Sequence, residues 1–251
     1  MSASPEHWTA GIHAVRSALG HGRESVQELL VDARRRDRRL AAVVKQAKEL
    51  GIPIAQVERE QLDKLVPGLN HQGILARTEA PAAGSENDLD ELLLALQGPP
   101  LLLILDGITD PHNLGACLRT ADAVGADAVI APRDKSVGLT PTVCKVASGA
   151  AANVPFIQVT NLARTLRHLQ GQHHVFLVGT ADDAEQSLFQ ADLSGPIAIV
   201  MGAEGSGMRR LTREHCDQLV SLPMLGTVES LNVSVATGVC LYEALRQRSI
   251  G

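Results

Sequence analysis

The feature that most constrains the fold is a series of short apolar runs between residues 101 and 224. Runs such as LLLILDG, at 101–107, lack polar alternation and are typical of strands buried on both faces of a sheet. There are six runs, at 101–107, 128–132, 154–159, 175–180, 197–202 and 218–224. Helical patterns lie between or after them, at 113–125, about 140–150, 161–170 and 232–248. The alternation predicts an α/β domain with a parallel sheet and helices on both sides.

A smaller α/β unit precedes this domain. Its helical patterns cover 11–22, 35–51 and 59–68, and its strand patterns cover 26–33, 52–58 and 73–79. Residues 80–88, APAAGSEND, are small and polar and contain a proline, which is typical of a linker. The next segment, 88–98, has the apolar spacing of a helix. We therefore expect a first domain over 1–79, a linker and helix over 80–98, and a second domain over 99–251.

Composition excludes several classes of protein. Hydrophobic residues make up 45% of the chain, which is too many for a chain disordered throughout. No apolar run approaches the roughly 20 residues that a membrane helix needs, and the first residues, MSASPEHWTAGIH, lack the pattern of a secretory signal. We therefore expect a cytoplasmic protein that does not contact membranes. Aromatic residues are only 2%, which argues against RNA recognition by stacking bases on aromatic side chains.

The cysteines and histidines do not form a recognisable metal motif. The four cysteines lie in apolar or helical stretches and are expected to be small buried residues without disulfides. No cysteine and histidine spacing matches a zinc motif. The sequence therefore predicts no metal. The four cysteines are Cys117, Cys144, Cys216 and Cys240.

Positive charge is concentrated in the first unit. Residues 1–78 contain 12 Lys and Arg against 9 Asp and Glu, whereas residues 79–251 contain 11 against 19. Five arginines are nearly contiguous: Arg34, Arg35, Arg36, Arg38 and Arg39. Such a run is either the solvated face of a helix or a contact for a polyanion such as RNA.

The first strand end that could carry chemistry is the stretch 106–113, which leads into a helix containing Arg119. Ligands of open α/β sheets bind at the carboxyl ends of the strands. Asp110 and Pro111 fit a turn, and Asn113 fits a helix N-cap. An arginine in the opening turns of a helix opposes the helix macrodipole, so Arg119 is a candidate for binding a phosphate or carboxylate.

Two further strand ends contain glycine, three residues in 200–208 and one in 222–234. The stretch 200–208, VMGAEGSGM, has neither the Lys of a P-loop nor the G-x-G-x-x-G spacing of a dinucleotide site. Its central Glu204 would repel phosphate and favours a positively charged ligand, although an ordinary turn would also explain the glycines. The stretch 222–234 places Ser230 and Asn232 at a helix start, where capping accounts for only one of them.

These three stretches resemble motifs 1, 2 and 3 of the SpoU, or TrmH-type, RNA ribose 2′-O-methyltransferases of the SPOUT superfamily. Motif 1 corresponds to 110–121, motif 2 to 202–207 and motif 3 to 223–236, in the family's order. The segments 11–15 and 70–74 are similar to the family's substrate-binding domain, which has an L30e-like fold. The resemblance covers essentially the whole chain.

The resemblance implies a fold, a methyl donor and a substrate. The second domain would contain a deep C-terminal trefoil knot that binds S-adenosylmethionine without a metal, and the protein would be a homodimer with the site near the interface. Within the family, the chain is most similar to members that methylate a guanosine in the peptidyl-transferase P loop of 23S rRNA. The RNA would be 23S rRNA or a ribosome-assembly precursor.

The resemblance also implies roles for individual residues. Arg119 would contact the RNA backbone and help to activate the 2′-oxygen, although its pKa makes it a poor base. Asn113, Glu204, Ser230 and Asn232 would complete the catalytic site. The methyl donor would be held by Met201, Gly202, Gly207, Leu222, Met224 and Leu231. In the first domain, RNA would be bound by His13, Arg34, Arg35 and Arg36.

Three positions depart from the family pattern. Glu229 replaces a small residue before Ser-Leu-Asn, Pro141 enters a predicted helix, and Trp8-Thr9-Ala10 replaces an aromatic residue directly before Gly-Ile-His. Two other functions stay open at this point. One is methylation of tRNA by an enzyme of the same fold, and the other is RNA binding by a protein with a decayed enzyme domain.

Overall fold

The computed structural model describes residues 7–20, 23–78 and 81–250. The chain divides into two compact units, Met1–Pro81 and Ala82–Gly251. The expected ends of the first helix at 21–22 and of the strand at 79, and the expected start of the linker at 80, lie outside the described residues.

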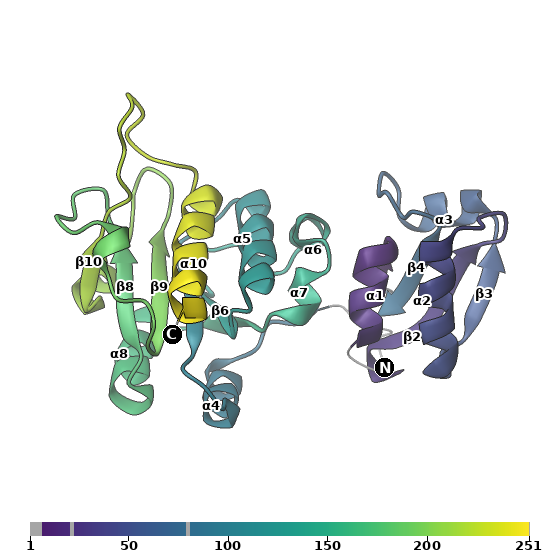
Figure 1. The fold of residues 1–251 in the computed structure, drawn as a ribbon, viewed down its shortest axis with the longest axis horizontal. Helices are drawn as coiled ribbons and strands as arrows, with labels where there is room; N and C mark the ends of the chain where they lie inside the picture. Colours follow the sequence, from purple (N-terminus) through teal and green to yellow (C-terminus); the bar gives the residue numbers. More distant parts are fainter. Residues whose placement is uncertain (1–6, 21–22, 79–80, 251) are drawn as a thin grey trace. The chain divides into compact units, whose positions relative to one another are not determined.

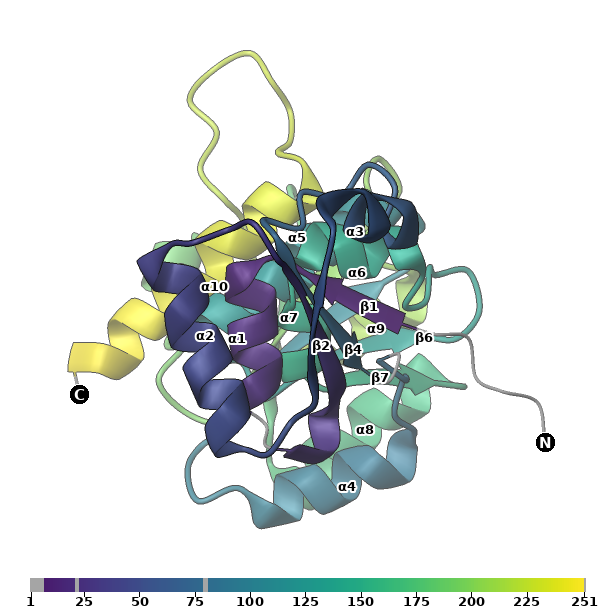
Figure 2. The same ribbon diagram turned by 90° about the vertical axis from the view of Figure 1, so that its right-hand side faces the viewer.

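The first unit is a four-stranded mixed sheet between two layers of helix. The strands are β1 (His7–Ala10), β2 (Val26–Asp32), β3 (Ile54–Val57) and β4 (Ile74–Thr78), in the order β1-β4-β2-β3. β2 and β3 are parallel, and the other pairs are antiparallel. Helices α1 (Ile12–Gly20) and α2 (Arg38–Glu49) pack side by side on one face of this sheet (Figure 2). Helix α3 (Arg59–Leu65) packs on the other face through Leu62.

Two elements of this unit differ from the sequence-based prediction. Helix α2 begins at Arg38 and not at residue 35, because the carboxylate of Asp37 caps it by accepting from the backbone N–H groups of Arg39 and Leu40. Strand β1 was not predicted. It is only four residues long and is formed by pairing with β4, from Ala10 opposite Leu75 to His7 opposite Thr78.

The second unit contains a sheet of six strands, every neighbouring pair of which is parallel. This confirms the predicted α/β fold with a parallel sheet. The strands are β5 (Leu101–Asp106), β6 (Ala128–Pro132), β7 (Phe156–Val159), β8 (Phe176–Thr180), β9 (Ile197–Gly202) and β10 (Gln218–Val220). Their order is β10-β8-β9-β5-β6-β7 (Figure 1).

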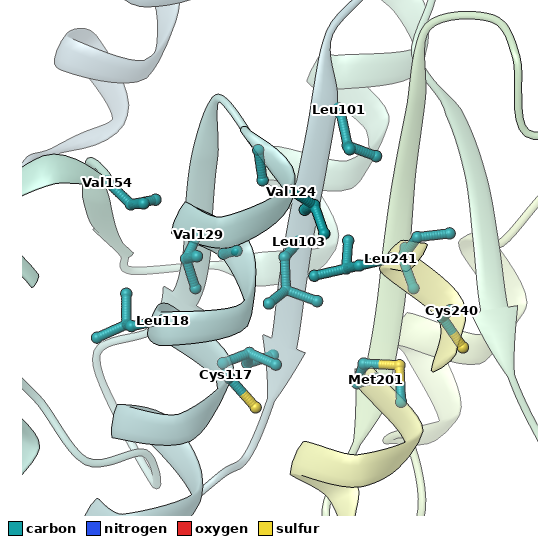
Figure 3. Packing of buried hydrophobic residues seen from close by; sticks show 14 of the residues in the cluster. Leu101, Leu103, Cys117, Leu118, Val124, Val129, Val154, Met201, Cys240 and Leu241 are labelled. Carbon is teal, nitrogen blue, oxygen red and sulfur yellow. The ribbon is translucent and has the colours of Figure 1, made fainter. Parts of the chain in front are cut away.

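Helices cover both faces of this sheet. Successive residues of a strand point to opposite faces, so a strand that is apolar throughout must be covered on both. Leu101 and Leu103 of β5 join the core under the helices α5 (Pro111–Val124), α6 (Pro141–Ala147), α7 (Ala150–Asn153) and α10 (Val233–Ile250) (Figure 3). Leu102 and Ile104 join the core under α4 (Glu86–Ala95) and α8 (Leu162–His173). Alternate residues of the uninterrupted apolar run of β5 therefore belong to different cores, one on each face of the sheet.

Two cysteines belong to the first of these cores. Cys117 of α5 and Cys240 of α10 are fully buried (Figure 3). Burial raises the pKa of the Cys117 thiol to about 11 and that of the Cys240 thiol to about 12. Both therefore act as small apolar residues, whereas Cys144 and Cys216 are only partly buried.

Two local features differ from the predicted pattern, and the structure also accounts for Pro141. The helix expected at about 140–150 is split into α6 and α7, because Ser148 and Gly149 adopt left-handed backbone angles. Pro141 is the first residue of α6, where a missing N–H costs nothing, and Thr140 caps the helix. Helix α9 (Arg210–His215) was not predicted.

Helix α4 begins earlier than predicted and is integrated into the second unit. The backbone of Gly84 pairs with β7 through Phe156 and Gln158, and Leu89 is buried under the sheet. Among the described residues, no helix is long and apolar enough to cross a bilayer.

Candidate active site

A cavity of about 450 Å³ lies at the carboxyl ends of β8, β9 and β10. This is the end of an open α/β sheet at which ligands bind. Its walls come from the residues after β8, the loop after β9, and the long segment between β10 and α10, which projects from the domain in Figures 1 and 2. Eight residues predicted from the sequence line it: Met201, Gly202, Glu204, Gly207, Leu222, Met224, Ser230 and Leu231.

The loop after β9 folds back tightly on Gly202. Ala203 and Gly207 bond each other through both backbone groups, at 3.1 and 2.9 Å. A Cβ at Gly202 would lie 2.2 Å from the backbone of Gly207 and Met208, so only glycine fits. Gly205 and Gly207 have positive φ angles of 75° and 65°, which side chains disfavour. Glycine at these positions therefore allows the tight turn that brings the loop to the cavity wall.

The start of α5 places Asn113 in the site. Asp110, and not Asn113 as predicted, is the N-cap of this helix, because its carboxylate accepts from the backbone N–H of His112. Pro111 fills the first helical position. Asn113 therefore lies in the first turn of the helix, and its side chain is not used for capping.

The three predicted motifs meet through Asn113, Glu204 and Asn232. The Asn232 amide donates to Asn113 Oδ1 at 3.0 Å and to Glu204 Oε1 at 2.5 Å. The Asn113 amide donates to the same carboxylate oxygen at 3.4 Å. Residues separated by up to 119 positions in the chain are thus joined at one carboxylate.

This network also fixes the start of α10. Asn232 Oδ1 accepts from the backbone N–H and the hydroxyl of Ser234, which is the pattern of a helix N-cap. Glu204 accepts from the backbone N–H of Val233 at 3.3 Å, so its negative charge lies at the positive end of the helix dipole. Asn232 thus accounts for the capping. Ser230 is exposed in the cavity wall.

A second, buried contact holds the loop after β9 to the centre of the sheet. Asp106, at the end of β5, has a fully buried side chain. It accepts from the Arg209 backbone N–H at 2.8 Å and from Arg209 Nε at 2.6 Å. The loop is therefore anchored at Glu204 by polar side chains and at Arg209 by a salt bridge.

Arg119 is not among the residues that line the cavity. Its side chain is exposed, and within the described part of the chain no hydrogen bond or ion pair holds its guanidinium. It is the ninth of the 14 residues of α5, in the middle of the helix, so the macrodipole argument made from the sequence was wrong. Arg119 is thus an exposed cation whose charge the fold does not use.

Sequence reasoning missed the residues that follow β8. Asp182 and Asp183 line the cavity, as does Arg213 of α9, which donates to both carboxylate oxygens of Asp183 at 2.9 and 3.0 Å. These hydrogen bonds hold the pKa of Asp183 below its usual range. The same rule of strand carboxyl ends applied to 175–180 would have found them.

In the first unit, the predicted RNA-binding arginines lie in the turn between β2 and α2. Arg34 is exposed and forms a surface ion pair with Glu58, and Arg36 is exposed. Arg35 is about two thirds buried and bonds Asp37, the cap of α2, so it supports the turn. His13 is exposed on α1.

Residues 100–242 match the SpoU rRNA Methylase family, and residues 9–83 match the RNA 2′-O ribose methyltransferase substrate binding family. The chain belongs to the SpoU rRNA methylase family. This confirms the resemblance drawn from the three motifs, and it makes the protein an RNA 2′-O-ribose methyltransferase.

Individual members of the SpoU family match over nearly the full length. The 23S rRNA (guanosine-2′-O-)-methyltransferase RlmB of Ralstonia nicotianae is 60% identical over 96% of this chain and 95% of its own. RlmB of Haemophilus influenzae is 59% identical over 95% and 96%. The crystal structure of the SpoU methyltransferase AviRb from Streptomyces viridochromogenes, in complex with AdoMet, superposes with a TM-score of 0.77 at 27% identity, over 98% of this chain and 92% of that one.

Proposed function

We propose that the protein transfers a methyl group from S-adenosylmethionine to the ribose 2′-oxygen of a guanosine in 23S rRNA. The observation that carries this proposal is the joining of the three motifs at Glu204, beside a cavity at the carboxyl ends of three parallel strands. The proposal is also supported by the similarity of the chain, across both units, to relatives named 23S rRNA (guanosine-2′-O-)-methyltransferase RlmB. The target within 23S rRNA is proposed to be the guanosine of the peptidyl-transferase P loop.

The cavity residues suit the methyl donor. Backbone at Gly202, Leu222 and Leu231 would hold its adenosine and methionine parts, with Met201, Gly207 and Met224 around them. A Cβ at Gly202 would collide with the backbone of Gly207 and Met208, so glycine is needed there for the loop to keep its shape beside the cavity. S-adenosylmethionine supplies a methyl group on a sulfonium, which is already activated, so we propose that transfer is independent of a metal.

The remaining difficulty is the weakly acidic 2′-hydroxyl, which must lose its proton as the methyl group is transferred. We assign Arg119 to the RNA phosphate beside the target ribose, where its planar guanidinium would also stabilise the developing 2′-oxyanion. Asn113, Glu204 and Asn232 would fix the three motif segments and the ribose, and Ser230 would contact the substrate from the cavity wall. Holding the two reacting groups in line supplies much of the rate.

The proposal extends to the rest of the molecule. The first unit, which we assign an L30e-like fold, would bind rRNA or an assembly precursor through His13, Arg34, Arg35 and Arg36. The segments of motifs 2 and 3 would form a deep trefoil knot. The enzyme would act in the cytoplasm as a homodimer with the site near the interface.

Two other functions are weaker. A decayed enzyme domain would not be expected to retain Asn113, Glu204 and Asn232 in one hydrogen-bonded cluster. Methylation of tRNA is disfavoured because the 23S rRNA enzymes match 95–96% of the chain, including the first unit.

The test is methyl transfer from labelled S-adenosylmethionine to 23S rRNA, to its assembly precursors and to tRNA, with the methylated ribose mapped on each. We expect one guanosine of 23S rRNA to be methylated. When metal is removed from the protein and EDTA is added to the assay, the rate of methyl transfer should equal that of the untreated protein. Methylation of tRNA alone would overturn the substrate assignment, and loss of transfer in the chelator would overturn the metal-independent reaction.

A further inference from the structure

Three side chains outside the methyl-transfer site converge on one point. Asp90 lies on α4, and His168 and His173 lie in the last two turns of α8. His168 Nε2 is 2.7 Å, and His173 Nε2 is 3.0 Å, from the same oxygen of Asp90, Oδ1. The two imidazole rings meet edge to face, with centroids 5.4 Å apart and planes at 75°. One atom of each side chain thus lies within 4.8 Å of the other two.

The cluster lies at the opposite end of the sheet from the cavity. His173 ends α8 just before β8 begins at Phe176, whereas the cavity is at the carboxyl end of that strand. Figures 1 and 2 both show α4 and α8 at the lower side of the view, away from the loop between β10 and α10, which projects at the top. Any ligand of the cluster is therefore separate from the methyl donor.

The donor set is that of a borderline transition metal. Two imidazole nitrogens and one carboxylate oxygen bind Zn²⁺ at about 2.0–2.2 Å, which places tetrahedral ligand atoms roughly 3.3 Å apart. The observed 2.7 and 3.0 Å need only a small outward movement of the rings. The side chains of His168 and Asp90 are 42% and 38% exposed, so solvent can supply the fourth ligand.

The surroundings favour a cation. The last turn of α8 presents the negative end of the helix dipole, and the Asp90 carboxylate already contacts both imidazoles.

We propose that Asp90, His168 and His173 form a binding site for one Zn²⁺ ion, which clamps α4 to α8. This departs from the sequence-based expectation of no metal, which rested on spacing along the chain. His168 and His173 are five residues apart, and Asp90 is 78 residues from the nearer one, so no linear zinc motif exists. Binding moves the proton of each Nε2 to Nδ1, because the metal needs the Nε2 lone pair.

The metal is a clamp and not a requirement for folding, because other contacts already hold α4. The carboxylate of Glu86 accepts from the backbone N–H and the hydroxyl of Thr160, at 2.8 and 2.6 Å. Leu89 is buried in the core under α8. Variants of the cluster are therefore expected to fold, which makes them usable in a test.

The experiment is titration of the full-length, metal-stripped protein with Zn²⁺ by calorimetry and with Co²⁺ by visible absorption. We expect one ion per chain, and a melting temperature raised by about 5 °C or more at a hundredfold excess over Kd. His168→Gln, His173→Gln and Asp90→Asn should each weaken binding at least tenfold. The control, His174→Asn, changes an exposed neighbouring histidine with φ 53°, a backbone angle that asparagine tolerates, and should bind as the unchanged protein does.

The proposal is overturned if the unchanged protein binds no Zn²⁺ with 1:1 stoichiometry, or if the Gln and Asn variants bind it equally well. The first result would mean that Asp90, His168 and His173 form a hydrogen-bonded cluster and no metal site. Methyl transfer by the metal-free protein at a temperature well below its melting point should match that of the loaded protein, so failure here is distinct from failure of the proposed catalytic function.

Discussion

The carboxyl end of the six-stranded sheet and the turn between β2 and α2 both gather polar side chains, but they use them differently. At the sheet, Asn113, Glu204 and Asn232 bond one another and so fix three distant segments. In the turn, the Asp37 carboxylate satisfies backbone N–H groups of its own helix, and Arg34 and Arg36 extend into solvent. The first arrangement suits chemistry that needs fixed geometry, and the second suits adaptable contact with a charged polymer.

Arg119 offers the largest test of this difference. Because the fold does not use its charge, Arg119→Ala should leave the melting temperature and S-adenosylmethionine affinity nearly unchanged while lowering single-turnover methyl transfer by about 10²–10⁴-fold. Arg119→Lys should recover little, because an ammonium lacks the planar fork of donors. Thermal melts and single-turnover assays on the same preparations make the measurement. Near-normal turnover in the alanine variant would remove Arg119 from the proposed mechanism.

Glu204→Gln should give the next largest effect, because it replaces the shared acceptor of Asn113 and Asn232 with an amide of the same size. We expect methyl transfer to fall about 10–100-fold and the affinity for S-adenosylmethionine to weaken, since Asn113 and Asn232 would then share only a neutral, weaker acceptor. Glu229→Gln is the matched control, because Glu229 lines the same cavity but makes no hydrogen bond within the described residues. Equal losses in both variants would mean that the charge of the cavity matters and the network does not.

Asp106→Asn tests the buried anchor of the loop after β9. It should lower stability by about 1–3 kcal/mol, or several degrees of melting temperature, because a buried carboxylate that accepts three contacts is replaced by a weaker acceptor. This loss of stability is smaller than that expected for a fully buried ion pair, because the Arg209 side chain is 46% exposed and solvent screens its charge. Glu214→Gln, which breaks an exposed pair with Arg210, should change the melting temperature very little. If calorimetric scans gave the two variants equal shifts in melting temperature, Asp106 would not be the anchor of the loop.

Changing Arg34 and Arg36 together to Ala should give the smallest effect on the reaction. Each arginine that contacts a phosphate adds about 0.7–0.9 to the salt dependence of RNA binding, so the slope should fall by up to about 2 and affinity by about 3–30-fold. Turnover at saturating RNA should not change. Lys45→Ala, on the exposed face of α2, is the control. A filter-binding titration at several salt concentrations in which both variants behave like the unchanged protein would identify the arginines as a solvated surface.

Most of the second unit was predictable because its signals are local. The six apolar runs became six parallel strands, and the capped or proline-initiated helices α5 and α6 lie close to where the pattern put them. Strand β1 could not be predicted, since four residues gain their structure only by pairing with β4, more than 60 positions away. The split between α6 and α7 depends on two left-handed residues that helical spacing does not reveal.

The sequence by itself determined the fold class and the three segments of the candidate site, because apolar runs and the polar and glycine residues that follow them are local features of the chain. Only the tertiary structure decided which side chains work together. Asn113, Glu204 and Asn232 share a hydrogen-bonded cluster, Asp106 meets Arg209 across 103 positions, and Arg119 lies outside the cavity wall. The physical reason is that hydrogen bonds and ion pairs depend on separations of about 3 Å in space, and the folding of a parallel sheet brings together strand ends that are far apart in the chain.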